Sequence, residues 1–273
     1  MMRDMVSASD ADAVTAFERD GAAVVRGAIE PGWIAAMRDA IADAMNDTGA
    51  AFTTRNGFYN GFLHWRRNPV FRDFLLDSAL PDIAQRFLRA RHVNFFYDQL
   101  IVKQPGLPSA TPWHLDSTYF PTREGKVLSI WIPFDHASPT SGAVTYFKGS
   151  HRWVHERGRV SVEAFVRDLP EPGSEIEGHE FLAWTLEPGD VLIHDVDTLH
   201  GAPATGPTAQ RRALATRWTD QDVRYDPRAD DFFHMGRNSG LPIPEIALET
   251  GAALTSELFP IAWPKRKPDT IKA

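Results

Sequence analysis

The sequence has no cysteine among its 273 residues. Disulfide bonds and thiolate metal sites are therefore excluded, and histidine and carboxylate side chains remain as metal ligands. No stretch approaches the roughly 20 consecutive apolar residues that a membrane span requires. The first residues also lack the apolar run of a secretory signal peptide. We therefore expect a cytoplasmic protein that does not enter a membrane.

The sequence also has no excess of positively charged residues. The chain has 29 lysine and arginine residues against 36 aspartate and glutamate residues, which gives a formal charge of −7. This balance argues against a general nucleic-acid-binding protein, although it leaves room for a local basic pocket. Hydrophobic residues make up 43% and charged residues 24%, as in an ordinary globular protein. A β-rich chain of this length commonly forms one undivided domain.

The segment 111–117 holds a histidine and an aspartate two residues apart, His114 and Asp116. In an extended chain, side chains at positions i and i+2 point to the same face. The imidazole and the carboxylate would then aim at one point, while Leu115 turns away into packing. Two such groups make up two of the three ligands of a facial metal triad, and the third ligand must come from elsewhere.

The best candidate for the third ligand is His200, just past the apolar run 191–193 that predicts a strand. Gly201 follows it, where another backbone can approach closely. Eleven residues after His200, Arg211 begins a strand-like segment in which Arg211 and Arg217 share one face. A buried arginine needs an anionic partner, and its fork suits a carboxylate. Such a set suggests Fe(II) together with a 2-oxo acid.

With these residues, the chain resembles the phytanoyl-CoA hydroxylase (PhyH)-like family of Fe(II)/2-oxoglutarate-dependent dioxygenases. The likeness runs from about Phe95 to Trp218. It rests on an ordered series of motifs, namely Trp113-His114-Leu115-Asp116, Leu128–Phe134, Ser141-Gly142-Ala143-Val144, Lys148-Gly149-Ser150-His151, Pro188-Gly189-Asp190, Thr198-Leu199-His200-Gly201 and Arg211. A lone His-x-Asp is weak evidence, whereas the ordered series with a distal histidine and arginine is specific.

The resemblance implies roles for these residues. The two histidines and Asp116 would bind Fe(II), and Arg211 would pair with the far carboxylate of 2-oxoglutarate. Gln99 and Trp131 match family positions beside this cosubstrate. O₂ and 2-oxoglutarate would be converted to succinate and CO₂ while a small-molecule metabolite is hydroxylated. Three further residues are expected to contact the substrate, namely Trp113, Phe120 and Arg217.

Two positions refine this interpretation. Many relatives carry a serine two residues after the distal histidine, where this chain has Ala202, so Arg211 needs another helper to hold the cosubstrate. The halogenating branch of the family lacks the carboxylate ligand, so the presence of Asp116 favours hydroxylation or a related oxidation. Two alternatives stay open, a zinc-dependent hydrolase that uses the same ligands and a non-catalytic jelly-roll binding module.

Short strands separated by glycine and proline turns predict a β-sandwich or barrel. The clearest strands are expected at residues 93–103, 127–134, 141–147, 181–186, 191–193 and 211–219. Together with the resemblance, this implies a mainly β protein whose core is a double-stranded β-helix (jelly roll, cupin-like) with N-terminal α-helices packed outside. We expect one domain over residues 1–273, made of a helical part (1–91), the jelly-roll core (92–220) and a C-terminal extension (221–273).

Three smaller expectations complete this plan. Pro31 begins a helix whose apolar stripe ends before Gly49. Residues 51–68 are rich in aromatic and basic side chains and are expected to form an irregular loop, a candidate lid over the active site. His194 lies inside an apolar strand and is expected to be a core histidine bonded to the backbone.

Overall fold

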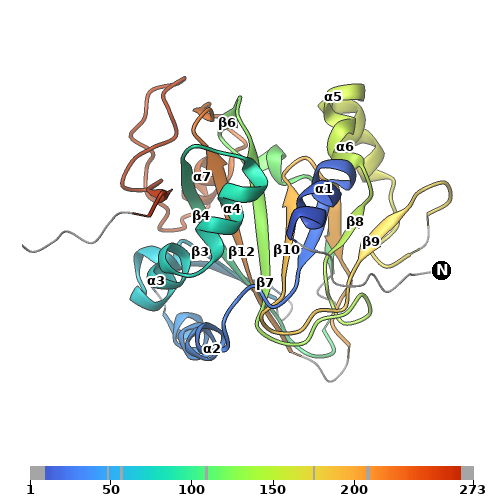
Figure 1. The fold of residues 1–273 in the computed structure, drawn as a ribbon, viewed down its shortest axis with the longest axis horizontal. Helices are drawn as coiled ribbons and strands as arrows, with labels where there is room; N and C mark the ends of the chain where they lie inside the picture. Colours follow the sequence, from blue (N-terminus) through green and yellow to red (C-terminus); the bar gives the residue numbers. More distant parts are fainter. Residues whose placement is uncertain are drawn as a thin grey trace, which may run out of the picture.

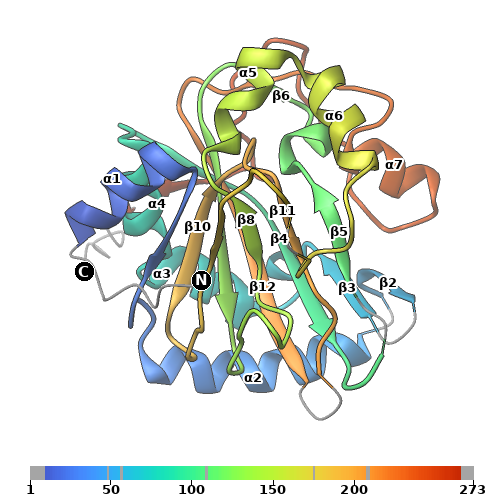
Figure 2. The same ribbon diagram turned by 90° about the vertical axis from the view of Figure 1, so that its right-hand side faces the viewer.

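The computed structural model describes residues 10–47, 49–55, 58–107, 110–174, 176–206 and 210–265. Within this part of the chain, most strands form two antiparallel sheets (Figures 1 and 2). The strands of the large sheet are, in spatial order, β1 (Ala22–Val25), β10 (Val191–Asp195), β7 (Val127–Pro133), β12 (Arg211–Asp220), β4 (Val93–Lys103), β3 (Phe58–Phe62) and β2 (Ala51–Arg55), with β14 (Ile261–Trp263) also pairing with β4. The strands of the small sheet are, in spatial order, β5 (Thr111–His114), β11 (His200–Ala202), β8 (Thr145–Phe147) and β9 (Phe181–Ala183).

The centre of the large sheet is made of strands that are apolar on both faces. Every residue of β7 is buried, and β12 lies between β7 and β4. Such strands are typical of a layer that is covered on both sides. The register fixes which side chains lie next to each other, because directly opposed residues in an antiparallel ladder share a face. The register of β12 with β4 and β7 determines which side chains line the site.

Helices from the first third of the chain cover the outer face of the large sheet. Figure 1 shows α2, α3 and α4 on one side of this sheet, and β8 and β9 of the small sheet on the other side. The helices are α1 (Asp10–Asp20), α2 (Pro31–Asn46), α3 (Pro69–Asp77) and α4 (Leu80–Leu88). Their apolar side chains and those of the sheet form one core cluster, which includes Met37, Phe74 and Leu214. The jelly-roll core with outer N-terminal helices is thus confirmed.

The expected irregular loop at residues 51–68 is wrong. Most of this segment is a β-hairpin of β2 and β3, which continues the large sheet beyond β4. A short 3-10 helix, His64–Arg66, follows the hairpin. Backbone hydrogen bonds to β4 satisfy polar groups that a loop would leave to water. Residues 51–55 and 58–62 are therefore part of the sheet.

The remaining elements surround the sheets. They are α5 (Trp153–Arg157), α6 (Arg159–Arg167), α7 (Phe232–Asn238) and the two-stranded pair of β6 (Thr122–Arg123) with β13 (Arg224–Tyr225). Residues 221–265 pack against the core, since Phe233 and Phe259 are fully buried there. The basic end of the tail, from residue 266 on, lies outside the described residues. No helix in the described part of the chain is long and apolar enough to cross a membrane.

Candidate active site

His114, Asp116 and His200 come together where the two short strands β5 and β11 pair. His114 ends β5, His200 begins β11, and the two are direct partners in the antiparallel ladder. Their rings lie 4.2 Å apart between centroids. The Oδ1 atom of Asp116 is 3.8 Å from Nε2 of His114 and 4.0 Å from Nε2 of His200. Within the described residues, this is the one group of three or more such side chains arranged to hold a metal ion.

Backbone carbonyl groups fix the orientation of both imidazoles. Nδ1 of His114 lies 2.8 Å from the carbonyl oxygen of Pro112, and Nδ1 of His200 lies 2.9 Å from that of Thr198. A carbonyl oxygen can only accept, so each Nδ1 carries the proton and each Nε2 keeps a free lone pair. Both lone pairs are therefore available on the side of Asp116, as a metal ligand set requires.

Asp116 is buried, at 3% exposure, and is held ionised by its neighbours. Burial by itself would raise the pKa of the carboxyl group, but the Arg217 guanidinium and the neighbouring histidines hold that pKa well below its usual value. The Nη2 atom of Arg217 donates to both carboxylate oxygens at 3.2 Å. Ser129 donates its hydroxyl to Oδ2 at 2.6 Å. Arg217 thus contacts a metal ligand instead of standing free for a substrate.

His194 is not the backbone-bonded core histidine that the sequence suggested. It lines the pocket beside the triad, with its ring centroid 4.4 Å from that of His200. Its Nδ1 atom is 3.2 Å from the Tyr146 hydroxyl, and its Nε2 atom is 3.5 Å from Oδ2 of Asp116. Burial lowers the pKa of His194, which keeps the ring neutral.

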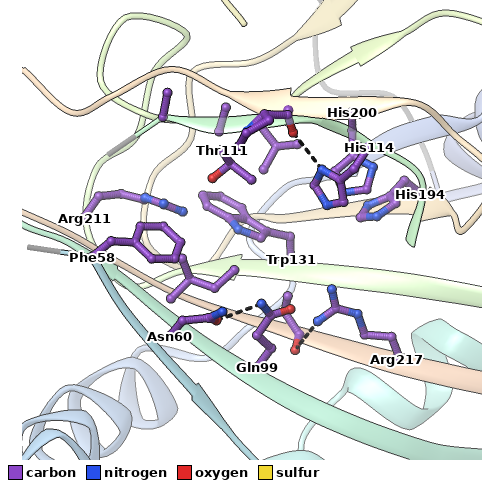
Figure 3. A pocket seen from close by; sticks show the side chains of 17 residues that line it. Phe58, Asn60, Gln99, Thr111, His114, Trp131, His194, His200, Arg211 and Arg217 are labelled. Carbon is purple, nitrogen blue, oxygen red and sulfur yellow. Dashed lines mark hydrogen bonds between the residues drawn. The ribbon is translucent and has the colours of Figure 1, made fainter. Parts of the chain in front are cut away.

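A pocket of about 390 Å³ opens beside the triad (Figure 3). One row of the large sheet contributes to it, because Ala215 of β12 is opposed by Trp131 of β7 on one side and by Gln99 of β4 on the other. The small Ala215 leaves space between the two larger side chains. Gln99 donates to the side-chain oxygen of Asn60 at 2.8 Å, so the hairpin strand β3 also borders the pocket. Gln99 and Trp131 both line this pocket.

Two buried cations lie at the pocket end formed by the start of β12. Arg211 and Lys103 are opposed across β12 and β4, and their exposed fractions are 1% and 0%. The Arg211 guanidinium lies over the Trp131 ring, and its Nε and Nη2 atoms have no hydrogen-bond partner within the described structure. Lys103 donates from Nζ to the carbonyl oxygens of Ala202 at 3.4 Å and Pro203 at 3.0 Å. Burial lowers the pKa of Arg211 to about 9. Burial and the nearby Arg211 lower the pKa of Lys103 to about 6.

Trp113 and Phe120 do not line the pocket, which corrects their expected role as substrate contacts. The Trp113 ring packs against Phe147 on the far side of β5, and its indole donates to the carbonyl oxygen of Pro170 at 2.8 Å. Phe120 is 1% exposed and packs edge-on against Phe96. Neither side chain can touch a molecule in the pocket in this conformation. Arg217 does line the pocket, although its guanidinium pairs with Asp116.

The residues present fit a metal ion with a bound acid. Two neutral imidazoles and one carboxylate suit a divalent transition metal that keeps open coordination positions. Arg211 has buried donors without partners, and an unpaired buried cation is costly unless an anion completes it. The pocket joins both features, since the triad histidines and Arg211 line the same cavity. An anionic ligand that spans from the metal to Arg211 would satisfy both ends.

Comparison with known proteins decides the family. The model of the phytanoyl-CoA dioxygenase (PhyH) family matches residues 17–213. The chain belongs to this family. The triad, Arg211 and Trp131 all lie within the matched region. Members of the PhyH family are dioxygenases that use iron and 2-oxoglutarate, so the family predicted from the motifs is confirmed.

Individual relatives are distant. Phytanoyl-CoA dioxygenase 1 of Oryza sativa subsp. japonica is 24% identical over 57% of this chain and 54% of its own length, so the match spans about half of that relative. A probable alpha-ketoglutarate-dependent hypophosphite dioxygenase of Stutzerimonas stutzeri is 26% identical over 67% of this chain and 66% of its length. Among solved structures, the epimerase SnoN from nogalamycin biosynthesis, in complex with Fe³⁺, alpha-ketoglutarate and nogalamycin RO, has a TM-score of 0.72 at 18% identity, over 93% of this chain and 98% of that one. This structural likeness supports the jelly-roll fold.

Proposed function

We propose that this PhyH-family protein is a non-haem Fe(II)- and 2-oxoglutarate-dependent dioxygenase that hydroxylates a small-molecule metabolite. The observation that carries the proposal is one pocket lined both by the triad histidines and by a buried, unpartnered Arg211. Iron with 2-oxoglutarate and O₂ supplies the oxidising chemistry when bound, and yields succinate and CO₂ as by-products. The protein supplies the binding, the orientation and the shelter from water.

His114, Asp116 and His200 would hold the metal. Both imidazoles present Nε2 because their Nδ1 atoms are bonded to backbone carbonyl groups, and Asp116 is ionised in its buried place. These three ligands would lie on one side of the metal and would leave coordination positions open for the cosubstrate and O₂. The complete set of ligands favours hydroxylation over halogenation, since the halogenating branch lacks the carboxylate.

Arg211 would bind the far carboxylate of 2-oxoglutarate, with Lys103 as the helper that Ala202 cannot be. Lys103 does not itself line the pocket, so it would act through its hold on the backbone at Ala202 and Pro203. Neither cation has a carboxylate partner within the described residues, and Asp135, the nearest acid to act on Arg211, is paired with Arg212. A dianionic cosubstrate would therefore supply the anionic partner that these basic side chains lack.

The walls of the pocket would exclude water and accommodate the organic substrate. Trp131, Ile101 and Val144 give apolar surface near the triad, while the paired amides of Gln99 and Asn60 offer polar contacts. The SnoN structure, which has a similar fold, likewise holds an organic molecule, nogalamycin RO, together with Fe³⁺ and alpha-ketoglutarate. A closed apolar wall strengthens the electrostatic interactions inside the site.

Two alternatives find less support. A zinc hydrolase has no use for an unpartnered arginine at the far end of the pocket, and the family model that matches this chain is that of a dioxygenase. A binding module without activity would not need three oriented ligands around one point.

Succinate formation tests the proposal. Purified protein is incubated with Fe(II), O₂, 2-oxoglutarate and a panel of small molecules, and succinate is measured. Asp116→Ala and Arg211→Ala should each reduce turnover at least about 100-fold, since each removes an oriented contact of the reacting complex. The matched control is Arg212→Ala. Arg212 is the neighbour of Arg211 on β12 and forms an ion pair with Asp135, so its variant should keep its activity. Turnover at the unaltered rate in the Asp116 or Arg211 variant would contradict the assigned role.

A further inference from the structure

We propose that Ser129 and Arg217 are positioning residues that hold Asp116 as a one-oxygen metal ligand, with Oδ1 toward the metal and Oδ2 turned away from it. This inference rests on the proposed function, because it takes the triad to be the metal site. It assigns to Arg217 a task in ligand geometry in place of the substrate contact expected from the sequence.

The two residues face Asp116 from one row of the large sheet. Ser129 of β7 and Arg217 of β12 are direct partners in the ladder, and His194 of β10 is the partner of Ser129 on its other side. Opposed side chains of an antiparallel ladder project from the same face. The row therefore delivers a hydroxyl, a guanidinium and an imidazole to one carboxylate, which is carried by the segment after β5.

The contacts distinguish the two carboxylate oxygens. Oδ2 accepts from Ser129 at 2.6 Å and from Arg217 at 3.2 Å, and lies 3.5 Å from Nε2 of His194. Oδ1 shares the Arg217 nitrogen at 3.2 Å and is the oxygen that lies near both triad imidazoles. Turning Oδ2 toward the metal would break a short hydrogen bond to a serine that is completely buried. Ser129 thus distinguishes Oδ2 from Oδ1, while Arg217 holds both oxygens of the carboxylate.

Arg217 is itself fixed in place, as a positioning residue must be. Its side chain is 5% exposed, its Nη1 atom donates to the carbonyl oxygen of Ala215 at 3.3 Å, and its guanidinium lies over the Tyr97 ring. A carboxylate that binds through both oxygens would occupy an additional coordination position. Ser129 holds Oδ2 and Arg217 fixes the carboxylate as a whole, and together they would keep that position free for the ligands that react.

Metal binding without turnover tests the inference. Co(II) is titrated into the protein in the absence of 2-oxoglutarate, and both the dissociation constant and the visible absorption spectrum of the bound Co(II) are recorded. The variants are Arg217→Met, Arg217→Lys, Ser129→Ala and the control Arg212→Met. Circular dichroism verifies that each variant is folded. The Co(II) spectrum depends on coordination number and geometry, which a general loss of stability would not change.

We expect Arg217→Met and Ser129→Ala to weaken Co(II) binding about 10- to 100-fold and to change its spectrum. Arg217→Lys should restore part of the affinity, because one nitrogen makes both contacts and an ammonium group can replace it. The Arg212→Met protein should bind as the unaltered protein does. If Arg217→Met does not fold, Ser129→Ala provides the decisive comparison.

An unaltered affinity and spectrum in the folded Ser129 or Arg217 variants would overturn the inference and leave the proposed function intact. An unaltered Co(II) affinity in His200→Ala would instead overturn the metal site itself. The two failures are therefore distinguishable.

Discussion

His114 and His200 are direct partners across the antiparallel ladder of β5 and β11, although they lie far apart in the chain. Their rings are 4.2 Å apart, and both face Oδ1 of Asp116. The backbone pairing of two short strands thus brings the ligands together. The ligand geometry therefore depends on how closely β11 approaches β5.

Gly201→Ala should weaken metal binding. A Cβ atom at this position would lie 2.6 Å from the Pro172 side chain and 3.0 Å from the carbonyl oxygen of Thr111. The added methyl group would push β11 from β5 and displace His200, so we expect a decrease of about tenfold or more in Co(II) affinity, measured by calorimetry. Gly32→Ala is the control, since nothing lies within 4 Å of a Cβ there. Equal affinities would show that the strand spacing does not govern the site.

Lys103→Met should weaken the binding of 2-oxoglutarate while leaving the metal in place. The substitution keeps the approximate length of the side chain and removes the amino group, opposite Arg211, that donates to the carbonyl oxygens of Ala202 and Pro203. We expect the dissociation constant for 2-oxoglutarate, measured by anaerobic calorimetry with Mn(II), to rise about tenfold, which corresponds to about 1.4 kcal/mol. Lys148→Met, at an exposed ion pair with Glu180, should have no effect. An unchanged constant would remove Lys103 from the cosubstrate site.

Acid should destabilise the fold through His64. This histidine is 1% exposed, and burial lowers its pKa to about 4. Between pH 6.5 and 4 the unfolded state therefore binds the proton and the folded state does not, so stability is lost as the pH falls. From pH 6.5 to pH 5 the contribution is about 2 kcal/mol, at 1.36 kcal/mol per pKa unit. Urea unfolding of His64→Gln should show a smaller loss than the unaltered protein, and His92→Gln, at an exposed site, should not.

Asp190→Ala should lower stability without changing the site. The carboxylate accepts from Arg26 at 2.7 Å, from the backbone of Gly27 at 2.9 Å and from that of Glu187 at 3.0 Å. Its removal leaves two amide groups without this acceptor and the partly buried Arg26 guanidinium with the carbonyl oxygen of Thr185 in place of an ion pair, which we expect to cost about 2 to 3 kcal/mol in urea unfolding. Co(II) affinity of the folded variant should stay the same. A stable variant would mean that water replaces these contacts.

Motif order and strand periodicity were sufficient to predict the fold and the family. The helix from Pro31 and the strands around residues 93–103 and 211–219 are present close to their expected bounds. Long segments of this kind carry many apolar positions in one period, so local and tertiary preferences agree. The strand expected at 141–147 is shorter, at Thr145–Phe147, because Ser138 to Gly142 form a hydrogen-bonded turn.

Other features depend on tertiary pairing that composition does not reveal. The hairpin at residues 51–62 was missed because aromatic and basic side chains suggested a mobile loop, although Asn56-Gly57 is a strong hairpin dipeptide in sequence terms. The helix α3 was also missed, while its signal was present in Asn68, whose side chain caps Val70 at 2.9 Å just before Pro69. The position of His194 beside Asp116 arises from the sheet register, which a strand pattern alone does not fix.

The strand β5 lies at the edge of the small sheet, with β11 as its one neighbour there in the described structure. Edge strands open more readily than central ones, because a single ladder holds them. A metal ion bound by both His114 and His200 would link β5 to its neighbour β11. Metal loading should therefore slow amide hydrogen exchange at residues 111–114, and iron supply would regulate the rigidity of the fold as well as its chemistry.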